Sequence, residues 1–401
     1  MIIVIIVSTI AMCLTIFSSY SPLKQGLKIA FLLVTILACI HYQYGNDYNS
    51  YYSAWQVISN NSLKVCLFGS KSIFDDGVRP ETGWIIINKL FSFKNGFYYL
   101  VAALNILING VYYFIITHNV PRRYWWLAFF IYIFSYQYYL LNFSMMRQGL
   151  AICLGILSVY CFGKNKYAWF VGLSVWNVLL HTSAVILIPI VFISKLASKH
   201  IKVYSEVLLT LTILLYIVSA FATRIFSSII QIDMFSKYND FYVGQTASGF
   251  YGIGFCLIAV QYALMLFFLL SHSDCKNAIG GSMNTYKIKE EYSGNNTVIY
   301  RLFDTGKLSE SDTLYILVSY TAFMLKPFES VGAELVVRLS FYFTVFDIIT
   351  LPIIYSKMKN QVVRIIFIVM LVVLLLYTYF SFWNKPVYHE YYSVFHTIFE
   401  L

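Results

Sequence analysis

The sequence has few charged residues and none of the short motifs of the common soluble enzyme classes. Only 11% of its 401 residues are Asp, Glu, Lys or Arg, whereas 59% are hydrophobic. It has no Walker loop, no G-x-S-x-G, no H-E-x-x-H and no G-x-G-x-x-G motif, which argues against an ATPase, a serine hydrolase or a zinc protease. Long apolar runs fill the chain instead, and they predict a polytopic membrane protein.

Cysteine is also scarce, with seven residues in the chain. Five of them fall within predicted spans and Cys275 falls on the predicted cytoplasmic side, so only Cys66 lies in an outer loop. A disulfide framework on the outer face is therefore excluded, and no pair of cysteines has the spacing of a metal site. We expect buried cysteines that act as small hydrophobic residues, and a protein without a metal or other cofactor.

The apolar runs predict an all-α fold of about twelve transmembrane helices, forming a single domain over residues 1–401. Basic residues follow alternate loops, which fits the positive-inside rule with both termini outside. The net charge of +10 therefore reflects topology and does not indicate a nucleic-acid partner. The predicted spans lie near residues 2–20, 27–42, 97–117, 124–141, 147–163, 167–181, 183–195, 204–222, 249–271, 311–326, 336–355 and 363–382.

Three hydrophilic segments interrupt the spans. Residues 43–96 are expected to form a large outer loop, in which residues 84–90 form a short amphipathic or re-entrant helix. Residues 223–248 are expected to form a second outer loop, and the polar segment 272–310 a cytoplasmic connector.

Two arginines stand at the predicted outer ends of apolar helices, where a membrane protein ordinarily avoids a cation. Arg147 begins the span 147–163, so its guanidinium lies beside the free N–H groups and positive dipole of a helix N-terminus. This combination binds phosphate or diphosphate well. Arg338 repeats the placement at the start of the next-to-last span. The alternatives are that Arg147 reaches the lipid headgroups and that Arg338 pairs with Glu334, one helical turn away.

Other polar candidates lie on the same predicted face. His181 sits at the junction of two spans, where it is either a general base or phosphate donor, or a structural hydrogen-bonding residue. Asp47 and Glu81 are carboxylates of the outer loop, and such residues are ordinarily solvated. A dense aromatic cluster over residues 42–55 fits either stacking on sugar rings or an interfacial aromatic belt.

Several short motifs follow one another in order along most of the chain: Gly45-Asn46-Asp47-Tyr48-Asn49-Ser50-Tyr51, Pro80-Glu81-Thr82-Gly83-Trp84, Asn142-Phe143 with Arg147-Gln148, His181-Thr182-Ser183-Ala184, and Arg338 with Phe341-Tyr342. In this combination the chain resembles the EpsG family of Wzy-type polysaccharide polymerases. One departure is that the acid of the second motif follows the proline, where the family pattern places it before.

The resemblance implies a membrane glycosyltransferase that extends O-antigen, capsule or exopolysaccharide on the outer face of the bacterial cytoplasmic membrane. Its donor and acceptor would be glycans linked to polyprenyl diphosphate, and a separate protein would regulate chain length. Arg147 and Arg338 would stabilise the departing diphosphate, and Asp47 or His181 would deprotonate the attacking sugar hydroxyl. Substrate contacts are expected from Tyr44, Tyr48, Glu81 and Gln148.

Other classes of protein share some of these features. A flippase or other transporter of lipid-linked glycans also needs cations within a membrane cavity, but they would line a path open to both leaflets. A ligase that transfers a finished glycan performs nearly the same chemistry, and only the ordered motifs favour a polymerase over it. A non-catalytic membrane subunit would leave the paired arginines unexplained.

Overall fold

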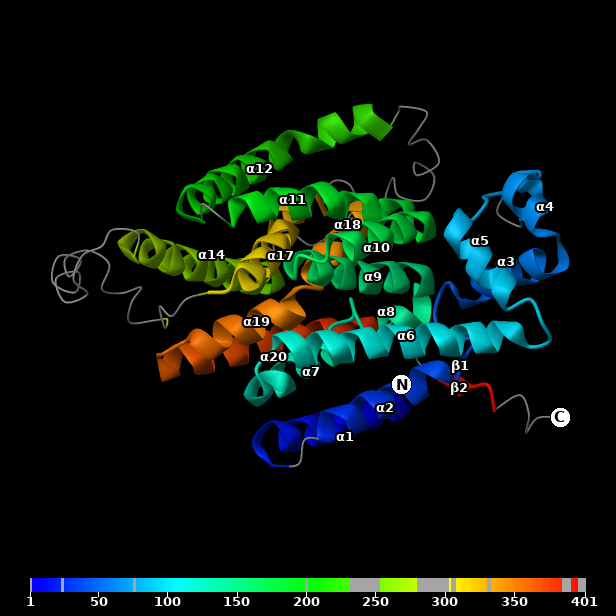
Figure 1. Ribbon diagram of the computed structural model, residues 1–401, viewed down its shortest axis with the longest axis horizontal. Coiled ribbons are helices and arrows are strands. Elements are labelled where there is room, and N and C mark those ends of the chain that lie inside the picture. The colour runs from blue at the N-terminus through cyan, green and yellow to red at the C-terminus, as the bar shows by residue number, and fades with distance from the viewer. Residues whose placement is uncertain are drawn as a thin grey trace. The chain divides into compact units, whose positions relative to one another are not determined.

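A computed structural model describes residues 2–22, 25–74, 77–198, 201–230, 253–279, 303, 308–329, 333–383 and 391–395. Helices dominate these residues, which confirms the predicted all-α class (Figure 1). The chain divides into two compact units, Met1–Val185 with Leu375–Leu401, and Ile186–Leu374. The prediction of one transmembrane domain over residues 1–401 stays a prediction.

Each predicted span contains a helix, although the helix in the span 124–141 ends at Phe134. The corresponding helices are α1 (Ile2–Tyr20), α2 (Gly26–Cys39), α6 (Gly96–Asn119), α7 (Trp125–Phe134), α9 (Met146–Gly163), α10 (Tyr167–Leu180), α11 (Leu187–Ala197), α12 (Ile201–Ile230), α14 (Ile253–Ile279), α17 (Glu310–Glu329), the pair α18 (Ala333–Thr344) and α19 (Asp347–Lys357), and α20 (Gln361–Trp383). Apolar composition therefore located the helices well.

The predicted count of about twelve transmembrane helices is not confirmed. Within the described residues, α1, α6, α9 and α20 are long and apolar enough to cross a membrane, and a fifth span results if the bent pair α18 and α19 is counted as one. A helix rises 1.5 Å per residue and the hydrocarbon core is about 30 Å thick, so about 20 residues are needed to cross it. Several other helices are shorter than this. The 14 residues of α10 thus extend only about 21 Å.

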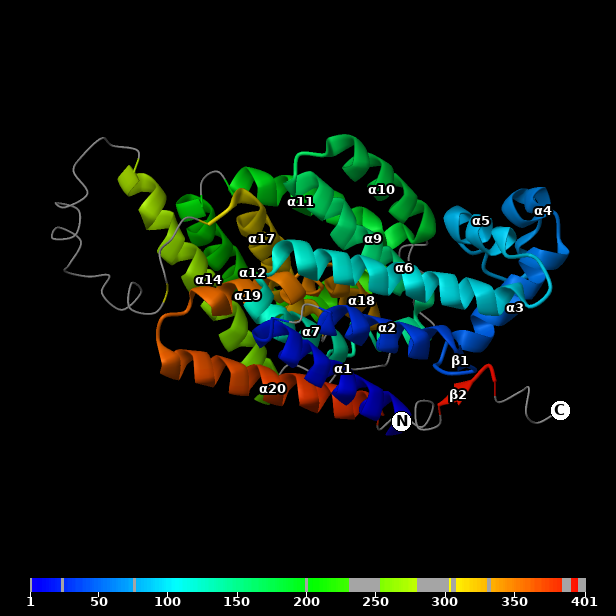
Figure 2. The same cartoon turned by 60° about the horizontal axis from the view of Figure 1, so that its bottom comes forward.

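In the first unit, α1, α2 and α6 lie side by side (Figures 1 and 2). Gly26 lets α2 approach α1 closely, since a Cβ atom there would lie 2.3 Å from the carbonyl oxygen of Leu14. Arg122 donates to the carbonyl oxygens of Ser18 and Ser21 and so satisfies acceptors at the C-terminal end of α1. The strands β1 (His41–Tyr42) and β2 (Tyr392–Ser393) pair antiparallel and hold the C-terminal segment beside the start of segment 43–96.

Segment 43–96 is folded into short helices at the end of the unit where α6 begins (Figure 1). These are α3 (Tyr48–Asn60), α4 (Leu63–Phe68), the 3-10 turn η1 (Lys71–Ile73) and α5 (Thr82–Leu90). A helix thus lies where the sequence predicted a short one, but α3 and α4 were not predicted. Their shared core is formed by Ile58, Cys66, Phe74 and Ile85. Lys89 fastens α5 to the C-terminal end of α3 by donating to three backbone carbonyl oxygens at 2.7–3.1 Å.

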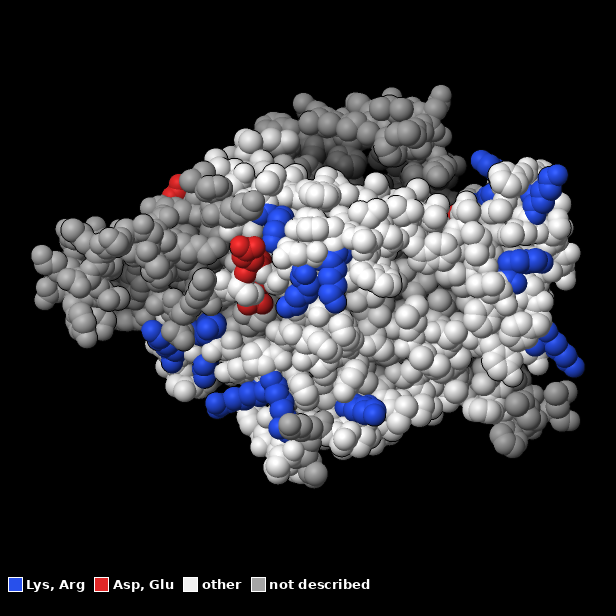
Figure 3. Space-filling view, in the orientation of Figure 1, with Lys and Arg blue, Asp and Glu red and all other residues white. Residues whose placement is uncertain are grey.

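In this unit, basic side chains lie over the short helices of segment 43–96, and the neighbouring helix α6 is uncharged. Figure 3 shows Lys and Arg side chains gathered over α3–α5, whereas no charged residue occurs in α6. Lys64, Lys71 and Lys94 are the exposed bases of this end. An uncharged helix beside a polar end is the pattern expected of a unit whose helices lie in lipid and whose end lies in water.

The second unit contains α11, α12, α14, α17, α18 and α19, with α17 in contact with each of the others. The carboxylate of Asp347, in the first turn of α19, is buried in this unit. It accepts hydrogen bonds from Ser319 at 2.5 Å, Gln261 at 3.1 Å and Tyr262 at 3.4 Å, and so ties α19 to α14 and α17. The predicted outer loop 223–248 and cytoplasmic loop 272–310 lie mostly outside the described residues.

Candidate functional site

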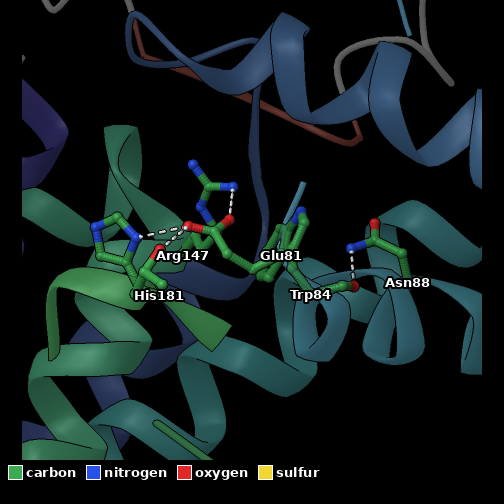
Figure 4. A network of polar contacts seen from close by, with 6 residues as sticks. Glu81, Trp84, Asn88, Arg147 and His181 are labelled. Carbon is green, nitrogen blue, oxygen red and sulfur yellow. Dashed lines mark hydrogen bonds and ion pairs between the residues drawn. The ribbon is translucent and has the colours of Figure 1, made fainter. Parts of the chain in front are cut away.

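The carboxylate of Glu81 gathers three side chains that lie far from it in the sequence (Figure 4). Its Oε2 accepts a hydrogen bond from Nη1 of Arg147 at 2.5 Å. Its Oε1 lies 3.2 Å from Nδ1 of His181 and accepts from Oγ1 of Thr182 at 3.3 Å. These residues come from three of the sequence motifs, and we refer to Glu81, Arg147, His181 and Thr182 as the Glu81 cluster.

Helix α5 is held against the end of α10, and this contact places Glu81 beside His181. A Cβ atom at Gly83 would lie 2.9 Å from the backbone carbonyl of Leu179, so only glycine allows the two backbones to approach this closely. The next residue, Trp84, is buried, and its ring lies 5.4 Å from that of Tyr51 in α3. Glu81 occupies the N-cap position of α5, but its side chain does not cap the helix and is available to the cluster.

Arg147 lies in the first turn of α9, as the sequence predicted. The chain breaks between α8 (Leu141–Ser144) and α9 at Met145, and this break sets the start of α9. A cation in the first turn opposes the helix dipole, and the nearby carboxylate of Glu81 supplies the compensating negative charge. The side chain of Arg147 is 28% exposed, so it remains accessible from solvent.

His181 ends α10 and faces the same carboxylate. Its backbone N–H donates to the carbonyl oxygen of Asn177 at 2.9 Å, which completes the last turn of the helix. Its side chain is 20% exposed. The imidazole is therefore fixed through its backbone by α10 and through its ring by Glu81, while part of the ring remains accessible.

A second contact brings the first and third motifs together. Gly45 adopts φ +103°, and a Cβ atom there would lie 2.4 Å from the carbonyl oxygen of Phe143, so the loop packs directly on the backbone of α8. Asp47 follows at the N-cap of α3 and is partly exposed. The side-chain hydrogen bonds described for Glu81 do not include Asp47.

The other predicted substrate contacts are buried. Tyr44 is fully buried, Tyr48 is 2% exposed and Gln148 is 3% exposed. The ring of Tyr44 lies 5.3 Å from that of Phe143, and the ring of Tyr48 lies 5.3 Å from that of Phe97. In this structure the two tyrosines pack inside the first unit.

Arg338 lies in α18 of the second unit, with a partly exposed side chain. Because it belongs to a different unit from the Glu81 cluster, its cooperation with Arg147 stays a prediction. The side chain of Glu334, its alternative partner, lies outside the described residues.

Electrostatics keep Glu81 ionised. Burial alone would raise the pKa of this carboxyl group, but the hydrogen bond from His181 and the positive charge of Arg147 outweigh burial and lower the pKa from 4.5 to about 2. At neutral pH the group therefore accepts hydrogen bonds and does not donate a proton. Among the described residues, no group of three or more His, Cys, Asp or Glu side chains is placed to hold a metal ion.

The sequence points to Arg147 and His181, but it assigns no role to Thr182 or Gly83. By itself Glu81 is an ordinary solvated loop carboxylate and the family resemblance makes it a substrate contact, whereas the structure places it at the centre of the cluster. The only sequence signal for these residues was their place within the motifs Pro80-Glu81-Thr82-Gly83-Trp84 and His181-Thr182-Ser183-Ala184.

The helical fold with several apolar spans defines a multi-pass membrane protein, and the charged cluster at its helix ends gives it a polar site. The EpsG family model matches residues 24–395, nearly the whole chain, and the protein belongs to this family, whose members are Wzy-like polysaccharide polymerases. No curated protein and no solved structure matches the sequence.

Proposed function

We propose that the protein joins glycan repeat units carried on polyprenyl diphosphate, on the outer face of the bacterial cytoplasmic membrane. The product would be an O-antigen, capsule or exopolysaccharide chain. The observation that carries this proposal is the accessible guanidinium of Arg147 at the N-terminus of α9, held beside His181 by one carboxylate. Membership of the EpsG family supports the same reaction class.

In the proposed reaction, a hydroxyl oxygen of the acceptor glycan attacks the anomeric carbon of the donor glycan. A C–O bond forms there, and the bond from the anomeric carbon to the diphosphate oxygen breaks. The bonding electrons leave with polyprenyl diphosphate, and the hydroxyl proton passes to a base. The reaction needs neither a nucleotide sugar nor a redox partner.

Negative charge grows on the diphosphate as it leaves, so cations fixed near it stabilise the transition state more than the bound substrate. Arg147 suits this role, because a guanidinium has five N–H donors and only the Nη1 group is described in contact with Glu81. The positive end of the α9 helix dipole adds to this effect. We assign the same role to Arg338 by hypothesis.

Tyr44, Tyr48 and Gln148 stay proposals as substrate contacts. Each is at most 3% exposed, so a glycan reaches them only if neighbouring side chains move. A separate length-regulating protein is proposed as the partner, together with the donor and acceptor glycans and the bilayer itself.

A glycan profile of cells that lack this protein tests the proposed function. Glycan with a single repeat unit and no ladder supports a polymerase. Complete absence of surface glycan, with lipid-linked units trapped inside, indicates a flippase, and long polymer retained on its lipid carrier indicates a ligase. An unchanged ladder contradicts all three. Complementation with Arg147→Glu at equal protein level should fail, and normal polymer from this variant would remove Arg147 from the mechanism.

A further inference from the structure

The contact between Glu81 and His181 determines which nitrogen of the imidazole carries a proton. Nδ1 of His181 lies 3.2 Å from Oε1 of Glu81. An ionised carboxylate has no proton to give and can only accept a hydrogen bond. Nδ1 must therefore be the protonated nitrogen, and in the neutral imidazole Nε2 is left with a free lone pair.

We propose that Glu81 is a positioning residue that holds His181 in the Nδ1–H form, so that Nε2 accepts the proton of the attacking sugar hydroxyl. This inference rests on the proposed function and assigns the base within it. It assigns the base to His181, whose ring contacts the ionised carboxylate, in preference to Asp47.

The arrangement restrains the imidazole from both sides. The backbone of His181 is bound to the last turn of α10, and its ring is bound to a carboxylate at the start of α5. Gly83 holds these two helices in direct backbone contact. Thr182 donates to the same oxygen that faces His181, and Arg147 to the other oxygen, so the carboxylate is itself held at three points.

The same carboxylate also balances charge during the reaction. When the hydroxyl oxygen bonds to the anomeric carbon, its proton moves to Nε2 and the imidazole becomes a cation. The negative charge of Glu81 next to Nδ1 stabilises that cation, in the way that an aspartate stabilises the histidine of a serine protease. The electron pair released from the anomeric carbon leaves with the diphosphate, near Arg147. Glu81 thus binds both the residue that accepts the proton, His181, and the residue that stabilises the leaving diphosphate, Arg147.

The pH dependence follows from the charged groups that face His181. Within the described residues these are Glu81, in direct contact, and Arg147, through the shared carboxylate, while Thr182 is uncharged. Replacing Glu81 by glutamine removes the negative charge that stabilises the protonated imidazole. The acid limb of the activity profile should therefore move to lower pH, and the rate at its plateau should fall.

The test uses the full-length protein in proteoliposomes, with a synthetic polyprenyl-diphosphate-linked repeat unit as both donor and acceptor. We expect Glu81→Gln to lower kcat about 100-fold or more, with KM for the donor nearly unchanged, because general base catalysis contributes about 10²- to 10⁴-fold. The acid limb should shift downward, Glu81→Asp should retain more activity, and Asp47→Asn should retain a normal pH profile. Glu81→Gln combined with His181→Gln should be no worse than His181→Gln alone.

The matched control is Glu310→Gln, which removes an exposed carboxylate paired with Lys195 at 3.1 Å in the second unit and should not change the pH profile. An unchanged kcat and pH profile in Glu81→Gln, or losses that multiply in the double variant, would overturn the inference. Thermal unfolding of each variant separates a folding defect from a catalytic one, and Glu81→Asp keeps the test valid if Glu81→Gln is unstable. If the unaltered protein makes no polymer, the proposed function fails; if it polymerises and Glu81→Gln does too, only this inference fails.

Discussion

Replacing Glu81 by glutamine should destabilise the protein by an amount that depends on pH. The structure lowers the pKa of this carboxyl group from 4.5 to about 2, which corresponds to ~3 kcal/mol of stabilisation of the folded state at neutral pH. Because the side chain is 23% exposed, we expect ~2–3 kcal/mol to be measured. The glutamine variant keeps the shape of the side chain but loses its charge and one acceptor oxygen, so the difference reports the ion pairs together with one hydrogen bond.

The sign follows from the direction of the pKa shift. A carboxyl group with a lowered pKa stabilises the folded state above its unfolded pKa of 4.5 and loses this contribution as pH falls toward about 2. The advantage of the unaltered protein over Glu81→Gln should thus be full at pH 7 and pH 5.5 and should shrink at pH 3.5. Unfolding in lipid nanodiscs, followed by tryptophan fluorescence, measures it. No difference at pH 7, or a difference that stays constant down to pH 3.5, would refute the reasoning.

Three further predictions concern other parts of the fold. Gly83→Ala should lower the free energy of unfolding by ~1–3 kcal/mol and reduce polymer yield, because the added Cβ atom would lie 2.9 Å from the Leu179 carbonyl. An unfolding curve like that of the unaltered protein would contradict the close approach of α5 to α10. Asp347→Ala should lower the free energy of unfolding by ~3 kcal/mol or more, since three buried donors lose their acceptor. Unchanged stability in nanodisc unfolding would show that Asp347 does not stabilise the second unit. Arg147→Lys should reduce kcat for the lipid-linked donor by about 10-fold or more in proteoliposomes, because an ammonium cannot bind Glu81 and a diphosphate through a planar fork; full activity would show that a point charge suffices.

The sequence predicted the positions of the helices, because an apolar run long enough to bury its backbone in lipid is a strong local signal. The start of α9, and with it the placement of Arg147 in the first turn, was predicted for the same reason. The number of membrane spans was not, since α7 and α10 have apolar composition but only 10 and 14 residues. Composition does not show where a short helix ends.

Helix α3 could not be predicted from hydrophobic periodicity. Tyr48 and Ile58 are its buried residues, and tyrosine, serine and asparagine make up most of the rest, so no aliphatic stripe marks the helix. Its packing against α5 decides its conformation.

The centre of the site was not predictable either, because its contacts are not local. Glu81 meets Arg147 and His181 across 66 and 100 residues of sequence, and without the fold each of them has an ordinary alternative role. Gly83 gave no signal of its own, since its importance lies in the backbone of Leu179 that it approaches.

The most direct test of the proposed polymerase activity is reconstitution. The purified protein in proteoliposomes is supplied with a polyprenyl-diphosphate-linked repeat unit, and the products are separated by size. The account predicts a ladder of lipid-linked chains, release of one polyprenyl diphosphate per bond formed, and loss of both in Arg147→Glu. Repeat units that remain single with the unaltered protein, or a ladder of equal length with Arg147→Glu, would contradict it.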